Sequence, residues 1–97
     1  MPKMGQHAIN IVYPIAGERF PKIDPICSIE SAYFAASFSV TCSGDHDVKW
    51  GFNDETIGNA SFYDEFSAQF TWKLPKGHHI FWVKSDCGEN RVKFQIG

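Results

Sequence analysis

The chain has 97 residues, 43% of them hydrophobic and 15% aromatic, and its formal net charge at pH 7 is −2. This length fits a single domain, and the hydrophobic and aromatic content excludes an intrinsically disordered chain. The weakly acidic, mixed charge excludes the basic stripe of a nucleic-acid or anionic-membrane binder, and no apolar run has the roughly 18 residues of a membrane-spanning helix.

The first expected element is a strand near the N-terminus. Residues 1–7 have no long apolar stretch, so we expect a flexible segment there and not a secretory signal. Residues 8–13 alternate apolar and polar side chains up to Pro14, which predicts a strand. Residues 15–25 are rich in Pro and Gly and indicate a connecting loop. We assign residues 8–97 to one domain.

Four more strands are expected through the middle of the chain. Apolar side chains recur at every second position in residues 34–42, 48–52 and 66–74. Residues 43–47 read as a turn between the first two of these strands. Asn53 and Asp54 then form a tight turn, and residues 56–58 return as a short strand.

Two further strands are expected at residues 78–83 and 91–96, with turns at 75–77 and 87–90. Short strands with a turn about every ten residues predict an all-β immunoglobulin-like β-sandwich of about seven antiparallel strands. The residues that share the inward period-two phase are expected to form one core: Phe34, Phe38, Val40, Trp50, Phe52, Phe70, Trp72, Phe81 and Phe94.

Three stretches resemble motifs of bacterial immunoglobulin-like modules. Residues 9–17 are similar to an I-x-x-P-x-x-G opening, residues 50–58 to a W-y-v-d-G-x-x-l-G hairpin with Glu55 at the Gly position, and residues 74–88 to l-x-x-G-x-H-x-l-x-v-x-D-x-x-G. Together they resemble the immunoglobulin-like domain at the C-terminus of bifunctional penicillin-binding proteins. The resemblance implies a non-catalytic accessory module of a bacterial cell-envelope protein, which binds protein or glycan or acts as a spacer.

The resemblance carries over no catalytic residue, and the sequence offers none of its own. It contains no Gly-rich phosphate loop, H-E-x-x-H or G-x-S-x-G motif. Cys87 lies between the acidic residues Asp86 and Glu89, which disfavour a nucleophilic thiolate. We therefore expect no enzymatic activity. The location is periplasmic or cell-surface if the chain is an excised or mature domain, with a cytoplasmic protein as the alternative.

The histidines do not predict a metal site or a cofactor. Adjacent residues of a strand point to opposite faces, so His78 and His79 cannot share an ion through that strand. His79 is instead expected to brace a corner of the sandwich with a ring N–H bonded to the backbone. His46, between Asp45 and Asp47, lacks the alternating oxygen donors of a Ca²⁺ loop and reads as part of a solvated turn.

Four aromatic residues are candidates for a ligand or partner surface: Tyr33, Phe62, Tyr63 and Trp82. Exposed aromatic rings beside Asn and Asp could stack on sugars, or could cover a neighbouring domain, a subunit or the second sheet. The alternative function is a self-associating protein that forms a homodimer through an exposed edge strand and such rings.

The chain has three cysteines, Cys27, Cys42 and Cys87. In an immunoglobulin-like sandwich the turn after the second strand and the last turn lie at the same end. Cys42 and Cys87 are therefore expected to be neighbours and form a candidate disulfide, with Cys27 unpaired. The competing interpretation is three reduced, buried thiols in a cytoplasmic protein.

Overall fold

The computed structural model describes residues 8–20 and 31–96, of which residues 19–20 and 31–34 are described by their backbone alone. These residues form an all-β fold. The expected flexible segment 1–7 and Cys27 lie outside the described residues. The described chain contains no helix long and apolar enough to cross a membrane. Its strands are β1 (Ala8–Tyr13), β2 (Arg19–Phe20), β3 (Ser31–Phe52), β4 (Glu55–Pro75), β5 (Gly77–Ser85) and β6 (Gly88–Ile96).

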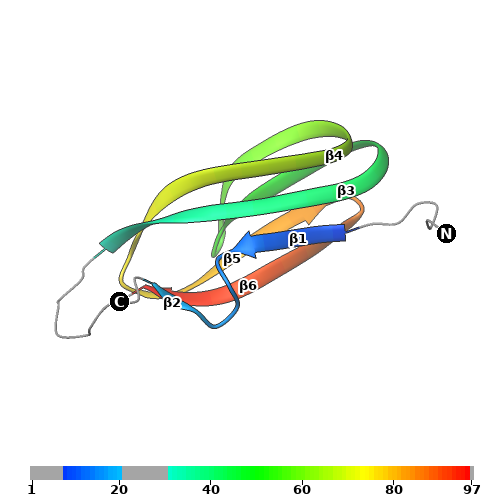
Figure 1. Ribbon diagram of the computed structural model, residues 1–97. Coiled ribbons are helices and arrows are strands. Elements are labelled where there is room, and N and C mark those ends of the chain that lie inside the picture. The colour runs from blue at the N-terminus through cyan, green and yellow to red at the C-terminus, as the bar shows by residue number, and fades with distance from the viewer. Residues whose placement is uncertain (1–7, 21–30, 97) are drawn as a thin grey trace.

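The strands form one curled sheet, in which the long β3–β4 hairpin bends over the other strands (Figure 1). The strand order is β1-β3-β5-β6-β2, with β4 paired to β3, and every pair is antiparallel except β2–β6. The first half of β3 pairs with β1, whereas its second half pairs with β5. The two halves of β3 thus serve different parts of the sheet, which lets the sheet close around a core.

The prediction of a turn at residues 43–47 is wrong, because these residues belong to β3, which pairs with β4 on both sides of them. The register shifts between Cys42 and Asp45, which is a β-bulge. Gly44 takes a φ of 97° there, a conformation that favours glycine, and opposite it Asp64 has a φ of 67°. The Gly44 N–H donates a 2.9 Å hydrogen bond to Asp64 Oδ1. The two strands therefore bend together, and β4 likewise joins the two strands expected at residues 56–58 and 66–74.

The other expected turns are found with small shifts. Asn53 and Asp54 form the tight turn between β3 and β4, with Asn53 at a φ of 56°. The last turn is at Asp86 and Cys87 and not at residues 87–90, because Gly88 already pairs with Ser85. The loop expected at residues 15–25 contains the two-residue strand β2, which pairs with the end of β6.

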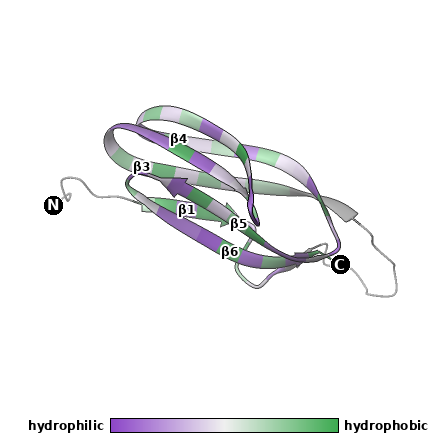
Figure 2. Ribbon diagram, turned by 180° about the vertical axis from the view of Figure 1, so that it is seen from behind, coloured by the Kyte–Doolittle hydropathy of each residue, from purple (hydrophilic) through white to green (hydrophobic). Residues whose placement is uncertain are grey.

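The core lies inside the curl, and apolar and polar residues alternate along the strands that enclose it (Figure 2). Five of the expected core residues are buried: Phe38, Val40, Phe52, Phe81 and Phe94. Two, Trp50 and Phe70, are half-buried against this core, and the side chain of Phe34 lies outside the described residues. The core also includes Ala36, Cys42, Val48, Phe62, Leu74, Val83 and Ile96, all buried.

Trp72 was expected in the core, but its side chain is 37% exposed. Its strand, β4, pairs only with β3 and so forms an edge of the sheet. The Trp72 ring stacks on Phe52, with centroids 6.2 Å apart, and within residues 8–20 and 31–96 no strand other than β3 pairs with β4. The period-two pattern therefore places Trp72 on the correct face of β4, but the edge position of this strand leaves the ring partly exposed.

The expected hydrogen bond from the His79 ring to the backbone is found. His79 is buried, and its Nε2 donates a 2.8 Å hydrogen bond to the Pro75 carbonyl at the β4–β5 turn. The Asn53 amide donates to His79 Nδ1 at 3.0 Å. His78 is exposed on the opposite face of β5, as the alternation predicts.

Candidate functional site

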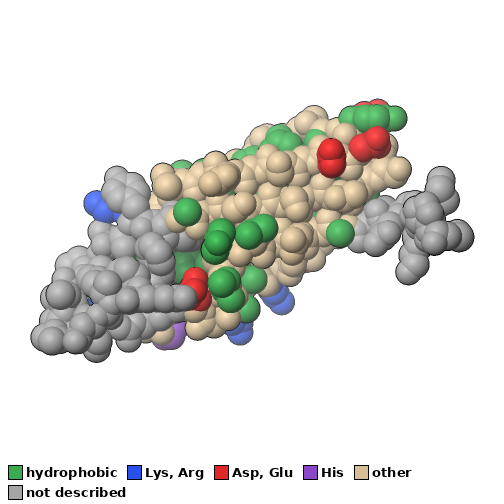
Figure 3. Space-filling model, viewed as in Figure 1, with side chains coloured by type: hydrophobic (Ala, Val, Ile, Leu, Met, Phe, Trp, Pro, Cys, Tyr) green, Lys and Arg blue, Asp and Glu red, His purple; other side chains and the backbone are tan. Residues whose placement is uncertain are grey.

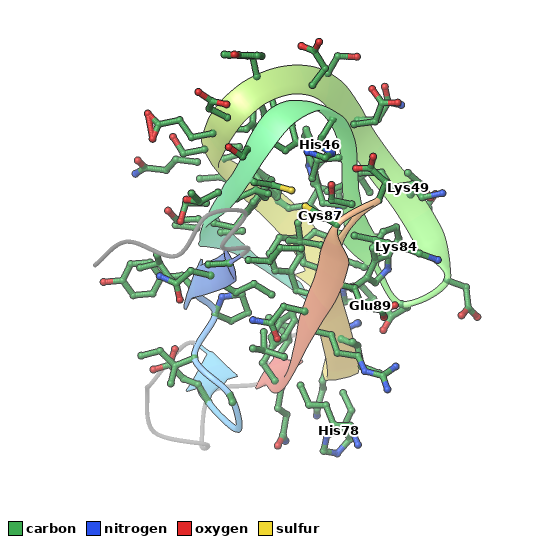
Figure 4. All side chains as sticks on the ribbon, turned by 90° about the vertical axis from the view of Figure 1, so that its right-hand side faces the viewer. His46, Lys49, His78, Lys84, Cys87 and Glu89 are labelled. Carbon is green, nitrogen blue, oxygen red and sulfur yellow. The ribbon has the colours of Figure 1, made fainter. Side chains whose placement is uncertain are left out.

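The main candidate site is a group of two thiols and an imidazole that we call the thiol–imidazole cluster: Cys42 and His46 on β3, and Cys87 in the β5–β6 turn. The two Sγ atoms and a ring nitrogen of His46 all lie within 4.8 Å of one another. Figure 4 shows His46 and Cys87 close together beneath the bend of β3 and β4, with His78 at the other end of the sheet. The sequence separates Cys42 from Cys87, but the sheet brings them to one place.

The bulge in β3 creates this proximity. Residues four apart on a straight strand share a face but are about 13 Å apart. The bend after Cys42 instead brings Cys42 Sγ to 3.1 Å from His46 Nε2. Cys87 comes close to both because the second half of β3 pairs with β5: Val48 lies opposite Ser85, and Cys87 follows Ser85 in the β5–β6 turn. The sequence feature that allows this bend is therefore Gly44, which lies between Cys42 and His46.

Both ring nitrogens of His46 have oxygen partners. Nδ1 lies 3.0 Å from each carboxylate oxygen of Asp86, and Nε2 donates to the Ser43 carbonyl at 2.8 Å. The Asp86 carboxylate, followed by the Ser43 carbonyl, holds the pKa of His46 above its usual range. The hydrogen bond from His46 in turn holds the pKa of Asp86 below its usual range. Because each ring nitrogen faces an oxygen acceptor, this arrangement favours the protonated form of His46 beside the ionised form of Asp86.

The two thiols have different surroundings. Cys42 is fully buried, and burial, then a hydrogen bond and charge interaction with Cys87 and the charge of Asp86, raise its pKa to about 11. Cys87 is half-buried, with its Sγ 3.4 Å from Ser85 Oγ. Cys42 is therefore a protonated thiol near neutral pH and is shielded from solvent, which disfavours Cys42 as a nucleophile.

The structure confirms that Cys42 and Cys87 are neighbours, and both side chains are thiols. The solvated turn expected around His46 is wrong, because only 18% of its side chain is exposed and its ring packs against Phe62 at 5.8 Å. Sequence reasoning missed the cluster because it treated residues 43–47 as a turn apart from the strand. The available signal in the sequence was Cys42 and His46, four residues apart with Gly44 between them, a spacing that a bulge at the glycine can bring together.

The four candidate surface aromatics lie in different surroundings. Tyr63 is 67% exposed and is followed in β4 by the acidic residues Asp64 and Glu65. Phe62 is buried, so its place on a surface is wrong: it lies opposite His46 across β3–β4 and turns inward, whereas the next residue turns outward. Trp82 is half-buried on β5. The side chain of Tyr33 lies outside the described residues.

Trp82 lies in a shallow hollow on the outer face of β3, β5 and β6, which we call the Trp82 face. Its indole Nε1 donates a 2.9 Å hydrogen bond to the Asn53 carbonyl. The ring lies so close to Gly51 that a Cβ there would be 2.7 Å from it. The polar and charged residues that line the hollow are Lys49, Asn53, Asp54, Thr56, Lys84, Glu89 and Arg91.

No protein-family model matches the chain, and no curated protein matches it significantly.

Proposed function

We propose that the chain is a non-catalytic immunoglobulin-like accessory module of a bacterial cell-envelope protein, periplasmic or cell-surface, that binds an envelope glycan through the Trp82 face. The strand pairing supports the immunoglobulin-like part of the proposal. If β3 and β4 are each divided at their bends, their four halves with β1, β5 and β6 make seven antiparallel strands. The corner bond of His79 and the sequence resemblance support the same assignment.

The Trp82 ring is the observation that carries the glycan proposal. The ring is fixed on one side by Gly51 and at its N–H by the Asn53 carbonyl. A fixed, half-exposed aromatic ring offers an apolar surface on which a sugar ring can stack with little loss of side-chain entropy. Asn53 and Asp54, in the adjacent turn, supply hydrogen-bonding groups of the kind that orient a ligand on such a surface.

The charges beside Trp82 favour a glycan that carries negative groups. Lys49 lies directly opposite Lys84 across β3–β5 (Figure 4), and like charges in this position destabilise a sheet. Glu89, opposite Lys84 on β6, offsets part of this repulsion. Arg91, opposite Trp82, adds a third cation to the hollow, against the two acidic residues Asp54 and Glu89. An anionic ligand would offset the remaining positive charge.

Co-sedimentation with isolated peptidoglycan tests this function. We expect the protein to pellet with it, Trp82→Ala to remove binding, and the double variant Lys49→Gln/Lys84→Gln to weaken it and to reduce its dependence on salt. Tyr63→Ala is the control, because that ring is more exposed but lies at the β3–β4 bend. Thermal melting checks that each variant is folded. Equal pelleting of the parent protein and Trp82→Ala would disprove the proposal.

Self-association is a second candidate, and the apolar end of β1 favours it. Val12, Tyr13 and Ile15 are 45%, 49% and 53% exposed. Figure 3 shows hydrophobic side chains gathered where β1 ends, and β1 stands at the end of the strand order. An edge strand with exposed apolar side chains can pair with a second copy. Light scattering tests this: a dimer that Val12→Lys converts to monomer would support it.

A further inference from the structure

We infer that the thiol–imidazole cluster is a zinc site, in which Cys42 Sγ, His46 Nε2 and Cys87 Sγ bind one Zn²⁺ ion and Asp86 positions the imidazole. This goes beyond the proposed glycan binding and involves a different part of the molecule. Two thiolates and an imidazole are a ligand set that Zn²⁺ accepts in proteins, whereas Mg²⁺ and Ca²⁺ prefer oxygen.

The spacing of the three ligand atoms fits the ion. Zn–S bonds of about 2.3 Å and Zn–N bonds of about 2.0–2.1 Å place tetrahedral ligand atoms about 3.5–3.8 Å apart. The three atoms already lie within 4.8 Å of one another, and Cys42 Sγ is 3.1 Å from His46 Nε2. Movements of less than about 1 Å by side chains would therefore complete the geometry.

Asp86 gives His46 the orientation that a zinc ligand needs. Its carboxylate accepts from Nδ1 at 3.0 Å, which leaves Nε2 beside Cys42 Sγ and the Ser43 carbonyl. A carboxylate bonded to the outer nitrogen of a ligand histidine is the usual second partner in zinc sites, where it fixes the ring and raises its basicity. Ser85 Oγ, 3.0 Å from Asp86 Oδ1, steadies the carboxylate in turn.

Binding exchanges protons for the metal. Both thiols lose their S–H proton, and His46 loses the Nε2 proton that it now donates to the Ser43 carbonyl. The two thiolates neutralise the charge of Zn²⁺, which is favourable because Cys42 is fully buried among apolar residues. The three ligands leave a fourth position for water.

The experiment uses the reduced full chain with Cys27→Ser, so that only the two described thiols respond. Titration with Zn²⁺ against a chromophoric chelator is expected to give one ion per chain with a Kd of about 1 µM or tighter. Co²⁺ in place of zinc is expected to give a thiolate-to-cobalt charge-transfer band. No stoichiometric binding of either ion would overturn the proposal.

Variants assign the ligands. Cys87→Ser and His46→Gln are expected to weaken zinc binding at least about 100-fold, and Asp86→Asn by about 10–100-fold with the one-to-one stoichiometry kept. His78→Gln is the matched control, since that histidine is exposed at the other end of the sheet (Figure 4). Melting curves check the folding of each variant. Unchanged zinc affinity in folded His46→Gln or Cys87→Ser protein would also overturn the proposal.

Discussion

The imidazole of His79 joins two turns of the sheet: its Nε2 donates to the Pro75 carbonyl at 2.8 Å, and its Nδ1 accepts from the Asn53 amide at 3.0 Å. Asn53 begins the β3–β4 turn, and Pro75 ends β4 just before the β4–β5 turn. Asn53 Oδ1 also accepts from the Ile80 N–H, so the network includes both the side chain and the backbone of β5. One buried ring thus fixes the relative position of the two turns.

Replacing His79 by Phe should destabilise the protein, because it keeps the ring volume but removes both hydrogen bonds. The Pro75 carbonyl and the Asn53 amide would lose their partner, and we expect a loss of about 1–3 kcal/mol in the free energy of unfolding. Urea denaturation measures it. His78→Phe, on the exposed face, should change stability by less than about 0.5 kcal/mol. Equal effects of the two variants would contradict the bracing role of His79.

The His46–Asp86 pair should stabilise the metal-free protein mainly in mildly acidic solution. The pKa of His46 is raised from 6.5, so its contribution is complete below that pH and is lost as pH rises through the raised value. The pKa of Asp86 is lowered from 3.8, so its contribution is complete above that pH and is lost as pH falls through the lowered value. Both contributions are complete between pH 3.8 and 6.5.

Thermal melting of the parent protein and Asp86→Asn in the presence of a chelator tests this window. The difference in Tm should be largest at about pH 5 and should shrink as the pH rises through the raised pKa of His46, where the imidazolium is lost. Asp64→Asn gives the same charge change outside the pair, and its effect should not show this maximum. A Tm difference that stays constant across this range would contradict the prediction.

The sequence predicts the strands far better than it predicts the cluster. Period-two spacing identified the strand at residues 34–42 and the inward Phe38 and Phe81, because burial on one face dictates that pattern. It could not show that β3 continues through Gly44. A glycine between polar residues is equally typical of a turn and of a bulge, and only pairing with β4 decides between them.

The same ambiguity explains the errors at individual side chains. Phe62 belongs to the part of β4 that pairs with residues 45–52 of β3, so without the bulge its inward phase could not be assigned. Trp72 has the inward phase but lies on an edge strand, and edge positions depend on strand order, which the local pattern does not contain. The nearness of Cys42 and Cys87 was predictable, because it follows from the order of strands alone.

Truncating Phe81 should cost far more stability than truncating Trp72. Phe81 is fully buried and packs against Phe38, Phe52 and Phe70. Phe81→Ala should therefore lower the free energy of unfolding by about 3–5 kcal/mol, measured by denaturation in urea. Trp72→Ala, at the exposed edge of β4, should cost less than about 2 kcal/mol. A reversed order of the two losses would show that the strand phase of β4 or β5 is wrong.

The last prediction concerns the redox chemistry of the cluster. Cys42 and Cys87 are adjacent thiols, so oxidised glutathione should link them by exchange, with release of two molecules of reduced glutathione. Because Cys42 is buried with its pKa raised to about 11, the reaction should be slow at neutral pH and faster in alkaline solution, where more thiolate forms.

The bridge would close a loop of about 45 residues and should add roughly 3–4 kcal/mol to the free energy of unfolding. Mass spectrometry after non-reducing digestion should find the Cys42–Cys87 peptide pair, and melting with and without reductant should show the gain in stability. Zinc bound at the same two sulfurs should slow the linkage, because the thiolates are then occupied by the ion. A Cys27–Cys87 linkage, or three thiols that still react with an alkylating reagent after prolonged oxidation, would contradict this pairing.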